Sequence, residues 1–289
     1  MKEKYGIKHF EGPVMELTTM IGCPLMCTFC PQENLRDSYG NSEKYMQPAD
    51  LVKVLAKLPK DTRIDFSGMS EPWANPHCTE MLETVLFMGF QVAIYTTLYG
   101  MKDPDRVRKV LEAHPSQVDV VMLHLPDANG NMKGWKQTTE WMNALESFMT
   151  WQLPCGIGAM TMDKSGFVAP ELQHIIGRLP SWQGHTRADS LNTEQVAGQP
   201  ISITPMNTFA LTCRSTPFYD RNVLLPNGDV VLCCMDYDLK HIIGNLLTQT
   251  YEEIFEGKPL LDLIKINEEP KFSKCSICKS CENVTELYV

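Results

Sequence analysis

Three cysteines near the N-terminus have the spacing of a metal-binding loop. Cys23, Cys27 and Cys30 form a C-x3-C-x2-C pattern directly after the apolar run 14–21. Thiolates are soft ligands that select Zn(II), Cu(I) or iron–sulfur clusters. A structural zinc site is normally closed by four protein ligands, and no fourth Cys or His lies close by in the sequence. The pattern therefore favours an iron–sulfur cluster with one open iron over a zinc knuckle or reduced structural thiols.

A second group of cysteines lies in the last third of the chain. Cys213 is followed by Cys233 and, after a long gap, by Cys275, Cys278 and Cys281. Four thiolates suit either an iron–sulfur cluster or a closed zinc site. The sequence thus predicts two separate metal centres, one near each end of the chain.

The segments that must position the first group alternate between short apolar runs and amphipathic stretches. Strands are expected at 15–21, 63–68, 91–97, 118–124, 156–162 and roughly 186–191. Between them, helical spacing of apolar residues predicts helices, including one after Pro170. This alternation predicts a parallel sheet with right-handed crossovers. Six units would make a partial (β/α)6 TIM-like barrel, an α/β fold with its reactive groups at the C-terminal strand ends.

The alternation stops near residue 200. We therefore expect a barrel domain at 1–200 and a small C-terminal α+β domain at 201–289. Two apolar runs flank Asn227-Gly228, a strong β-hairpin pattern. Thr250 and Glu253 have the spacing of a capping box at a helix start, and another helix is expected at about 260–266.

Composition limits the class of protein. The 289 residues include 43% hydrophobic side chains, enough for a sizeable core, and the formal net charge is −9. No block of Lys and Arg is present, so no nucleic-acid partner is expected. No run approaches about 18 apolar residues, so no membrane span is expected, and no signal peptide is found. Eleven cysteines then indicate metal or redox ligands in a reducing compartment, the cytoplasm.

The cysteine loop, the strand before it and the aromatic Phe29 resemble the radical S-adenosylmethionine (radical SAM) family. In that family three cysteines hold a 4Fe-4S cluster whose open iron binds the amino and carboxylate groups of S-adenosylmethionine (SAM). The second predicted strand ends in Ser-Gly-Met69-Ser70-Glu71-Pro, where the family usually has Gly-Gly-Glu-Pro. The resemblance implies Ser70 and Glu71 as contacts of the cofactor's amino group, although Met69-Ser70 replaces the two glycines.

Three more strand ends carry cofactor contacts in the family. Thr97 stands where relatives often have an amide side chain, and His124 stands where relatives have a polar residue touching the ribose. Arg187 lies in a run that resembles Arg-Ala-Gly-Asn of one branch, so it is expected to pair with the cofactor carboxylate, which a guanidinium matches in geometry. A packed histidine and a structural salt bridge are the alternatives for His124 and Arg187.

The C-terminal cysteines resemble the auxiliary-cluster extension called twitch, the short form of the SPASM domain. The run Cys-Lys-Ser-Cys-Glu-Asn is similar to the end of an inosamine dehydrogenase of this class. The resemblance implies one auxiliary 4Fe-4S cluster. Its implied ligands are Cys213, Cys233, Cys278 and Cys281. Cys275 is a possible substitute for one of them, and Cys234 is expected to be a neighbour.

The resemblance implies a radical SAM oxidoreductase. Such an enzyme cleaves SAM reductively to a 5′-deoxyadenosyl radical and abstracts a hydrogen from a polar small molecule or a peptide. The substrate is then oxidised by dehydrogenation or bond formation, with the auxiliary cluster as the electron conduit. A reducing partner such as flavodoxin or ferredoxin is expected.

Other functions remain open at this point. A radical epimerase would need a cysteine as hydrogen donor, for which Cys78 and Cys155 are candidates besides Cys234. Peptide cross-linking is another alternative, but about a dozen residues before the first strand are too few for a leader-peptide-binding domain, which favours a small molecule. A non-enzymatic metal or redox sensor is the contrasting class. A sensor would not need the polar strand ends at 70–71 and 96–97.

Overall fold

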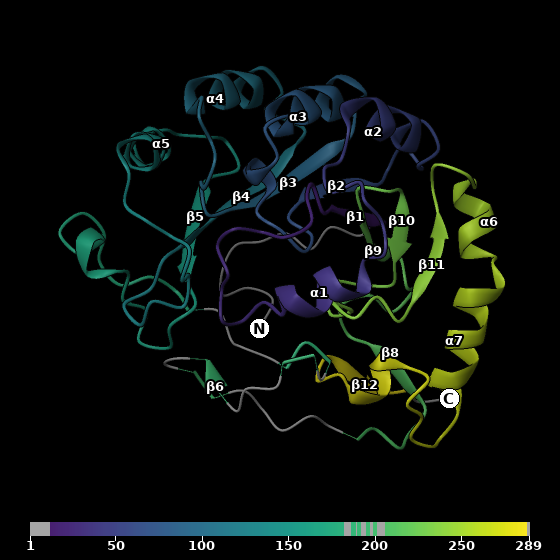
Figure 1. Ribbon diagram of the computed structural model, residues 1–289. Helices are drawn as coiled ribbons and strands as arrows, with labels where there is room; N and C mark the ends of the chain where they lie inside the picture. The colour runs from purple at the N-terminus through teal and green to yellow at the C-terminus, as the bar shows by residue number, and fades with distance from the viewer. Residues whose placement is uncertain are drawn as a thin grey trace.

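The computed structural model describes residues 12–181, 186–188, 190–191, 195–196, 199–200 and 206–287. An eight-stranded sheet in the order β11-β10-β9-β1-β2-β3-β4-β5 forms its centre (Figure 1). Neighbouring strands from β9 through β1 to β5 are parallel. The strands of this sheet are β1 (Val14–Leu17), β2 (Arg63–Phe66), β3 (Gln91–Thr96), β4 (Val118–Leu125), β5 (Ile157–Thr161), β9 (Arg221–Leu224), β10 (Asp229–Val231) and β11 (Ile242–Asn245). The predicted α/β class and parallel sheet are confirmed.

Helices follow the first strands and cover the outer side of the curved sheet (Figure 1). These are α2 (Pro48–Leu55), α3 (Cys78–Phe87), α4 (Pro104–Ala113) and α5 (Thr139–Met149). At the start of α4, the Asp103 side chain accepts a hydrogen bond from the Arg106 amide, and Pro104 fits the first helical position. A shorter helix, α1 (Gln32–Ser38), follows the cysteine loop and lies on the inner side of the sheet, where the sequence pattern predicted nothing.

The last predicted strand and helix of the barrel are wrong. After β5, the predicted helix is reduced to the 3-10 turn η2 (Pro170–Leu172). The described residues of 186–191 form turns and loop instead of a strand. Arg187 and Ala188 have φ angles of 54° and 50°, a left-handed conformation that an extended strand cannot contain. A single parallel bridge from Thr161 to Ser181 is all that pairs with β5 at this edge among the described residues.

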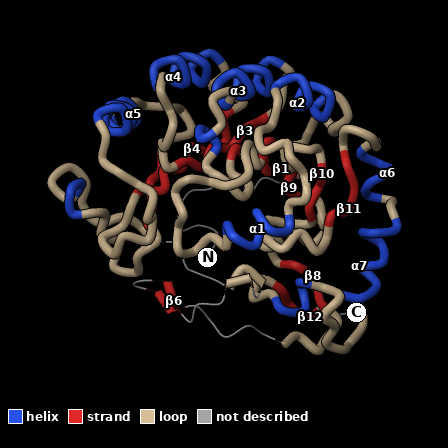
Figure 2. The backbone as a smooth tube through the Cα atoms, viewed as in Figure 1, coloured by secondary structure: helices blue, strands red, loops and turns tan. Residues whose placement is uncertain are grey.

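The C-terminal segment extends the same sheet. The predicted hairpin at Asn227-Gly228 is confirmed by β9 and β10, and β9 pairs in parallel with β1 across the predicted boundary near residue 200. The capping box of Thr250 and Glu253 is confirmed at the start of α6 (Tyr251–Phe255), and α7 (Lys258–Glu268) contains the other predicted helix. Figure 2 shows α6 and α7 beside β11.

The remaining elements are short. A two-stranded antiparallel sheet joins β8 (Leu211–Cys213) to β12 (Val284–Glu286), and a second joins β6 (Gln195–Val196) to β7 (Gln199–Pro200). Two 3-10 turns, η1 (Pro72–Ala74) and η3 (Ile277–Ser280), follow β2 and precede β12. Among the described residues, no helix is long and apolar enough to cross a bilayer.

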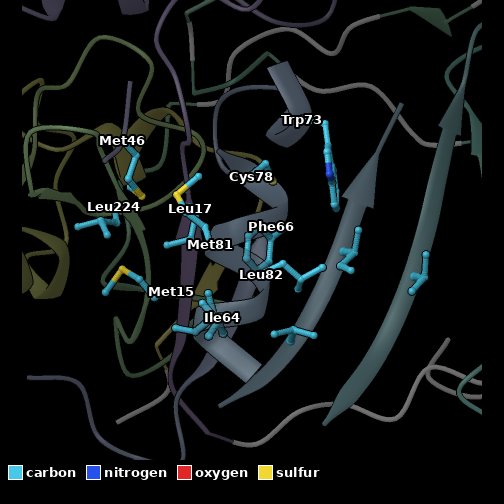
Figure 3. Close-up of a cluster of buried hydrophobic side chains, with 14 of the residues drawn as sticks. Met15, Leu17, Met46, Ile64, Phe66, Trp73, Cys78, Met81, Leu82 and Leu224 are labelled. Carbon is cyan, nitrogen blue, oxygen red and sulfur yellow. The ribbon is translucent and has the colours of Figure 1, made fainter. Parts of the chain in front are cut away.

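The main hydrophobic core lies between the sheet and its outer helices. Phe66 on β2 packs there against α3, where Met81 and Leu82 are fully buried (Figure 3). Burying each such side chain contributes about 1.5–3 kcal/mol. This packing fixes the strand ends, on which the polar side chains of the inner cavity stand.

Candidate functional site

A cavity of about 400 Å³ opens at the C-terminal ends of the parallel strands. The three N-terminal cysteines and all six predicted cofactor contacts line it, although they come from five separate parts of the sequence. These residues are Cys23, Cys27, Cys30, Phe29, Ser70, Glu71, Thr97, His124 and Arg187. Its volume is within the usual range for small-molecule sites.

The cysteine loop is fixed by its neighbours. The Gln32 side chain accepts a hydrogen bond from the Cys23 amide at 3.2 Å and donates one to the Met69 carbonyl at 2.6 Å. The Gln32 side chain therefore links the cysteine loop to the loop after β2 by two hydrogen bonds. In that second loop Gly68 has φ of 54°, and a Cβ there would lie 2.6 Å from the Thr18 amide nitrogen. Only glycine fits this close approach.

The three thiols of the loop lie close enough to influence one another's charge. Burial raises the pKa of Cys23 to about 12 and also raises the pKa of Cys27, and repulsion from Cys30 adds to both shifts. Buried thiolates therefore require positive charge beside them. Within the described chain, no three His, Cys, Asp or Glu side chains converge closely enough for a single ion. A 4Fe-4S cluster is wider and brings the positive charge that soft thiolates require, so these residues fit it.

Glu71 connects the ends of two strands. Its carboxylate accepts hydrogen bonds from the Thr96 hydroxyl at 2.6 Å and from the Thr97 amide and hydroxyl at 2.7 Å each. It also accepts from the Trp73 amide. Burial raises the pKa of Glu71, and these donors counteract the shift. Glu71 and Thr97 thus hold the cavity wall together, and the Ser70 hydroxyl accepts a hydrogen bond from the Met20 amide beside them.

His124 and Arg187 face the same space from other segments. Burial, followed by the nearby Arg187 charge, lowers the pKa of His124 to about 4, so the imidazole is neutral at pH 7. The Arg187 guanidinium lies 5.6 Å from the Tyr237 ring centroid and donates to the Cys234 carbonyl at 3.5 Å. Phe29 packs with Met132 and Met162 on the opposite wall. Tyr237 also contacts the first thiol group, since its hydroxyl lies 3.6 Å from the Cys30 sulfur.

The sequence interpretation missed several polar residues inside the barrel. Glu16, Asp65 and Tyr95 line the cavity from β1, β2 and β3. Arg63 pairs with Asp65 at 2.7 Å, whereas no Lys or Arg within the described ranges pairs with Glu16. Burial, then repulsion from Asp65, raises the pKa of Glu16 to about 7. A charged residue at an alternate position of an otherwise apolar strand was the available sign.

The cysteines considered as hydrogen donors differ in whether they line the cavity. Cys78 is fully buried on α3 in the hydrophobic core (Figure 3), and Cys155 precedes β5; neither lines the cavity. Cys234, which was expected only as a neighbour, does line it. Trp73, two residues after Glu71, does not line the cavity either, because its ring is buried and donates to the Thr79 hydroxyl.

Contacts between distant segments of the chain bring the second cysteine group together. Strand β12 pairs with β8 so that Val284 faces Cys213, and the Ile277 amide donates to His241 Nε2, which belongs to the loop after β10. Burial raises the pKa of Cys278 to about 11 and of Cys281 to about 12, and the Cys213 charge adds to both. Cys233 is affected in the same way by Cys278 and Cys281. These four thiols are neighbours and fit a second cluster.

Cys275 differs from those four thiols. Its side chain is exposed, whereas Cys278 and Cys281 are buried. Its sulfur is also not among the main charges that raise the pKa of Cys233, Cys278 or Cys281. The arrangement therefore favours the other four as ligands.

Comparison with known proteins agrees with this organisation. The family model of the SPASM iron-sulfur cluster-binding domain matches residues 213–282. Biotin synthase of Xanthomonas campestris pv. campestris (strain B100) is 25% identical over 215 residues, which cover 70% of this chain and 60% of the synthase. The match therefore spans less than two thirds of that relative.

Two solved structures share the fold along nearly the whole chain. The crystal structure of BtrN in complex with AdoMet and 2-DOIA has a TM-score of 0.57 at 14% identity and covers 96% of this chain and 94% of BtrN. Native anSMEcpe with bound AdoMet and Cp18Cys peptide has a TM-score of 0.53 at 16% identity and covers 93% of this chain and 86% of anSMEcpe. The chain therefore has the fold of these AdoMet-bound structures, and its C-terminal segment matches the SPASM iron-sulfur cluster-binding domain.

Proposed function

We propose that this chain removes a hydrogen atom from a polar substrate and oxidises it. The observation that carries the proposal is that three thiols and six predicted cofactor contacts line one cavity. When bound, the N-terminal cluster and SAM supply a 5′-deoxyadenosyl radical, which takes a hydrogen atom from a C–H bond. The protein must then bind, orient and shield the reactants.

Each cofactor group has a residue to hold it. Cys23, Cys27 and Cys30 would ligate three irons and leave one for the amino acid part of SAM. Arg187 is placed to pair with its carboxylate, because it lines the cavity beside Cys30 and Tyr237. Ser70, Thr97 and Phe29 would contact the rest of the cofactor.

The inner end of the cavity indicates a polar substrate. Glu16, Asp65, Tyr95 and Arg221 supply carboxyl, hydroxyl and guanidinium groups there, and such groups confer specificity on otherwise apolar sites. Oxidation of an alcohol or amine also releases a proton from oxygen or nitrogen. Glu16, with its pKa near 7, is suited to accept that proton as a general base.

The auxiliary site would accept the remaining electron. Cys213, Cys233, Cys278 and Cys281 would close all four irons of that cluster, which leaves no position for substrate. Its task is then electron transfer from the substrate radical, and the hydrogen atom, the proton and the electron are all accounted for. A flavodoxin or ferredoxin in a reducing cytoplasm would supply the electron that cleaves SAM, and the free state of the cysteines suits that compartment.

Radical epimerisation is the second candidate, and one observation favours it. The Cys234 thiol lines the cavity, whereas Cys78 and Cys155 do not, so Cys234 is the hydrogen donor that such a reaction would use. The structure of BtrN contains 2-DOIA as well as AdoMet, and that of anSMEcpe contains a peptide. A polar small molecule and a peptide are therefore both candidate substrates.

The test is anaerobic assay of the iron-loaded, reduced protein with SAM and candidate substrates, aminocyclitols and cysteine-containing peptides among them. Formation of deoxyadenosine is expected, with deuterium transferred into it from a labelled substrate. A product lighter by two hydrogens indicates oxidation. An isomeric product that takes up deuterium from D2O would indicate epimerisation instead. That product should no longer form in the Cys234→Ala variant. Absence of deoxyadenosine from fully loaded protein would contradict both and favour a metal or redox sensor.

A further inference from the structure

One lysine is enclosed between the buried cysteines of the second site. Lys279 lies in η3, next to Cys278 and two residues before Cys281, and its side chain has an exposed fraction of 0%. Lysine is almost never fully buried unless a partner compensates its charge. The position therefore requires an explanation.

The hydrogen bonds of Lys279 match the ammonium form of its side chain. Its Nζ donates to the carbonyls of Phe209 at 2.7 Å, Asn267 at 3.3 Å and Glu269 at 2.7 Å. Three acceptors require three N–H donors, which only the ammonium form has. Within the described part of the chain, no carboxylate forms an ion pair with it.

Hydrogen bonds from Asn207 hold the loop that contains Lys279 in place. The Asn207 amide donates to the Lys279 carbonyl at 2.8 Å. The Asn207 side chain donates to the carbonyls of Cys278 at 3.3 Å and Cys281 at 3.1 Å. The lysine and both cysteines are thus held by one set of hydrogen bonds, in which Asn267 and Ser276 also take part. Two negative charges act on Lys279, the Glu269 carboxylate first and then the Cys278 thiolate.

We propose that Lys279 is the counter-charge of the auxiliary cluster, raises its reduction potential and thereby lets it accept an electron from the substrate. This inference rests on the ligand set proposed above. A cluster bound by four thiolates is negatively charged and becomes more so on reduction, and a nearby fixed positive charge favours the reduced state. The simpler explanation is that Lys279 only caps the end of α7, where its Nζ donates to the carbonyls of Asn267 and Glu269.

The experiment isolates the second cluster in the full-length chain. Cys23, Cys27 and Cys30 are all replaced by alanine, and the auxiliary cluster is titrated by EPR at controlled potentials. In this background Lys279→Arg keeps the charge, whereas Lys279→Met and Lys279→Gln remove it. Lys271→Met removes an exposed lysine nearby, whose charge is screened by water and salt. No substrate turnover is needed, so the result is independent of the proposed reaction.

The inference predicts a midpoint potential that shifts to more negative values in the Met and Gln variants and stays near the parent value in the Arg and Lys271→Met variants. If Lys279→Met and Lys279→Gln retain the cluster's iron and have the same midpoint potential as Lys279→Arg, the inference is wrong. If the neutral variants lose the cluster while the Arg variant retains it, the charge requirement is supported. If the Arg variant loses it as well, shape rather than charge matters and the inference fails. A parent without iron in this background would refute the ligand set itself.

Discussion

The two cysteine sites of this chain differ in how the sequence and the fold create them. The first takes three thiols from eight consecutive residues and faces a cavity lined by titratable side chains. The second gathers four thiols from segments that begin at residue 213 and end at residue 281, and encloses them with buried amides and a lysine. One site is open to small molecules, and the other is shielded.

This difference matches two chemical tasks. Bond cleavage needs a metal corner that a cofactor can reach, which three ligands on one loop provide. Electron transfer needs a constant environment, because the potential of a cluster depends on nearby charge, hydrogen bonds and solvent exposure. If the comparison is right, damage at each site should abolish a different measurable property.

The largest effect is expected at the first site. Cys23→Ala should abolish deoxyadenosine formation, because an open-iron cluster cannot form on the two remaining thiols. Iron analysis should show loss of about one of the two clusters. Cys275→Ala is the matched control, since this exposed thiol should leave both iron content and SAM cleavage unchanged. Persistent cleavage in the Cys23 variant would refute the division of tasks.

Loss of one enclosed cysteine should separate the two tasks. Cys281→Ala is expected to remove the auxiliary cluster and to stop substrate oxidation, while substrate-independent cleavage of SAM persists at the parent rate. Iron content and deoxyadenosine formation, measured on the same sample, check this outcome. Equal loss of cleavage in both variants would mean that the two sites are not independent.

The sequence predicted the cysteine loop of the first site but not all of the residues that line its cavity. A short motif after a strand predicted the position of Cys23, Cys27 and Cys30, because parallel strands end at one edge. Glu16 escaped notice, since a single charge within an apolar run is visible only when the neighbouring strands are in place. The predicted strand at 186–191 failed because Arg187 and Ala188 adopt left-handed φ angles, which residues other than glycine adopt only under tertiary constraint.

The second site was readable only in part. Resemblance suggested four ligands and left Cys275 as a substitute, whereas burial of Cys278 and Cys281 beside Cys213 distinguishes them from the exposed Cys275. Buried polar residues such as Asn207 carry no sign in the sequence. Their partners are backbone carbonyls some 70 residues away along the chain.

A third prediction uses the buried carboxyl of Glu16 at the open site. The pKa of Glu16 is raised from 4.5 to about 7 in the folded chain, so the folded state binds a proton more tightly than the unfolded state. This contribution is fully present below pH 4.5 and is lost as pH rises through 7. Glu16→Gln should flatten that decline by at most about 3 kcal/mol. Urea unfolding of the apo-protein from pH 5 to 8 measures the free energy of unfolding at each pH. If this free energy changes with pH in parallel for the parent and for Glu16→Gln, the prediction is wrong.

The smallest effect should arise in the scaffold of the enclosed site. Asn207→Ala removes the donor to the Cys278 and Cys281 carbonyls and leaves both buried without that partner. The free energy of unfolding of the apo-protein should fall by about 1–3 kcal/mol, and the auxiliary cluster should be lost faster to a chelator. Asn129→Ala, an exposed change, serves as the control. SAM cleavage should be the same in both variants, because Asn207 contacts only the second site. A loss of cleavage in Asn207→Ala alone would show that the enclosed site supports the open one.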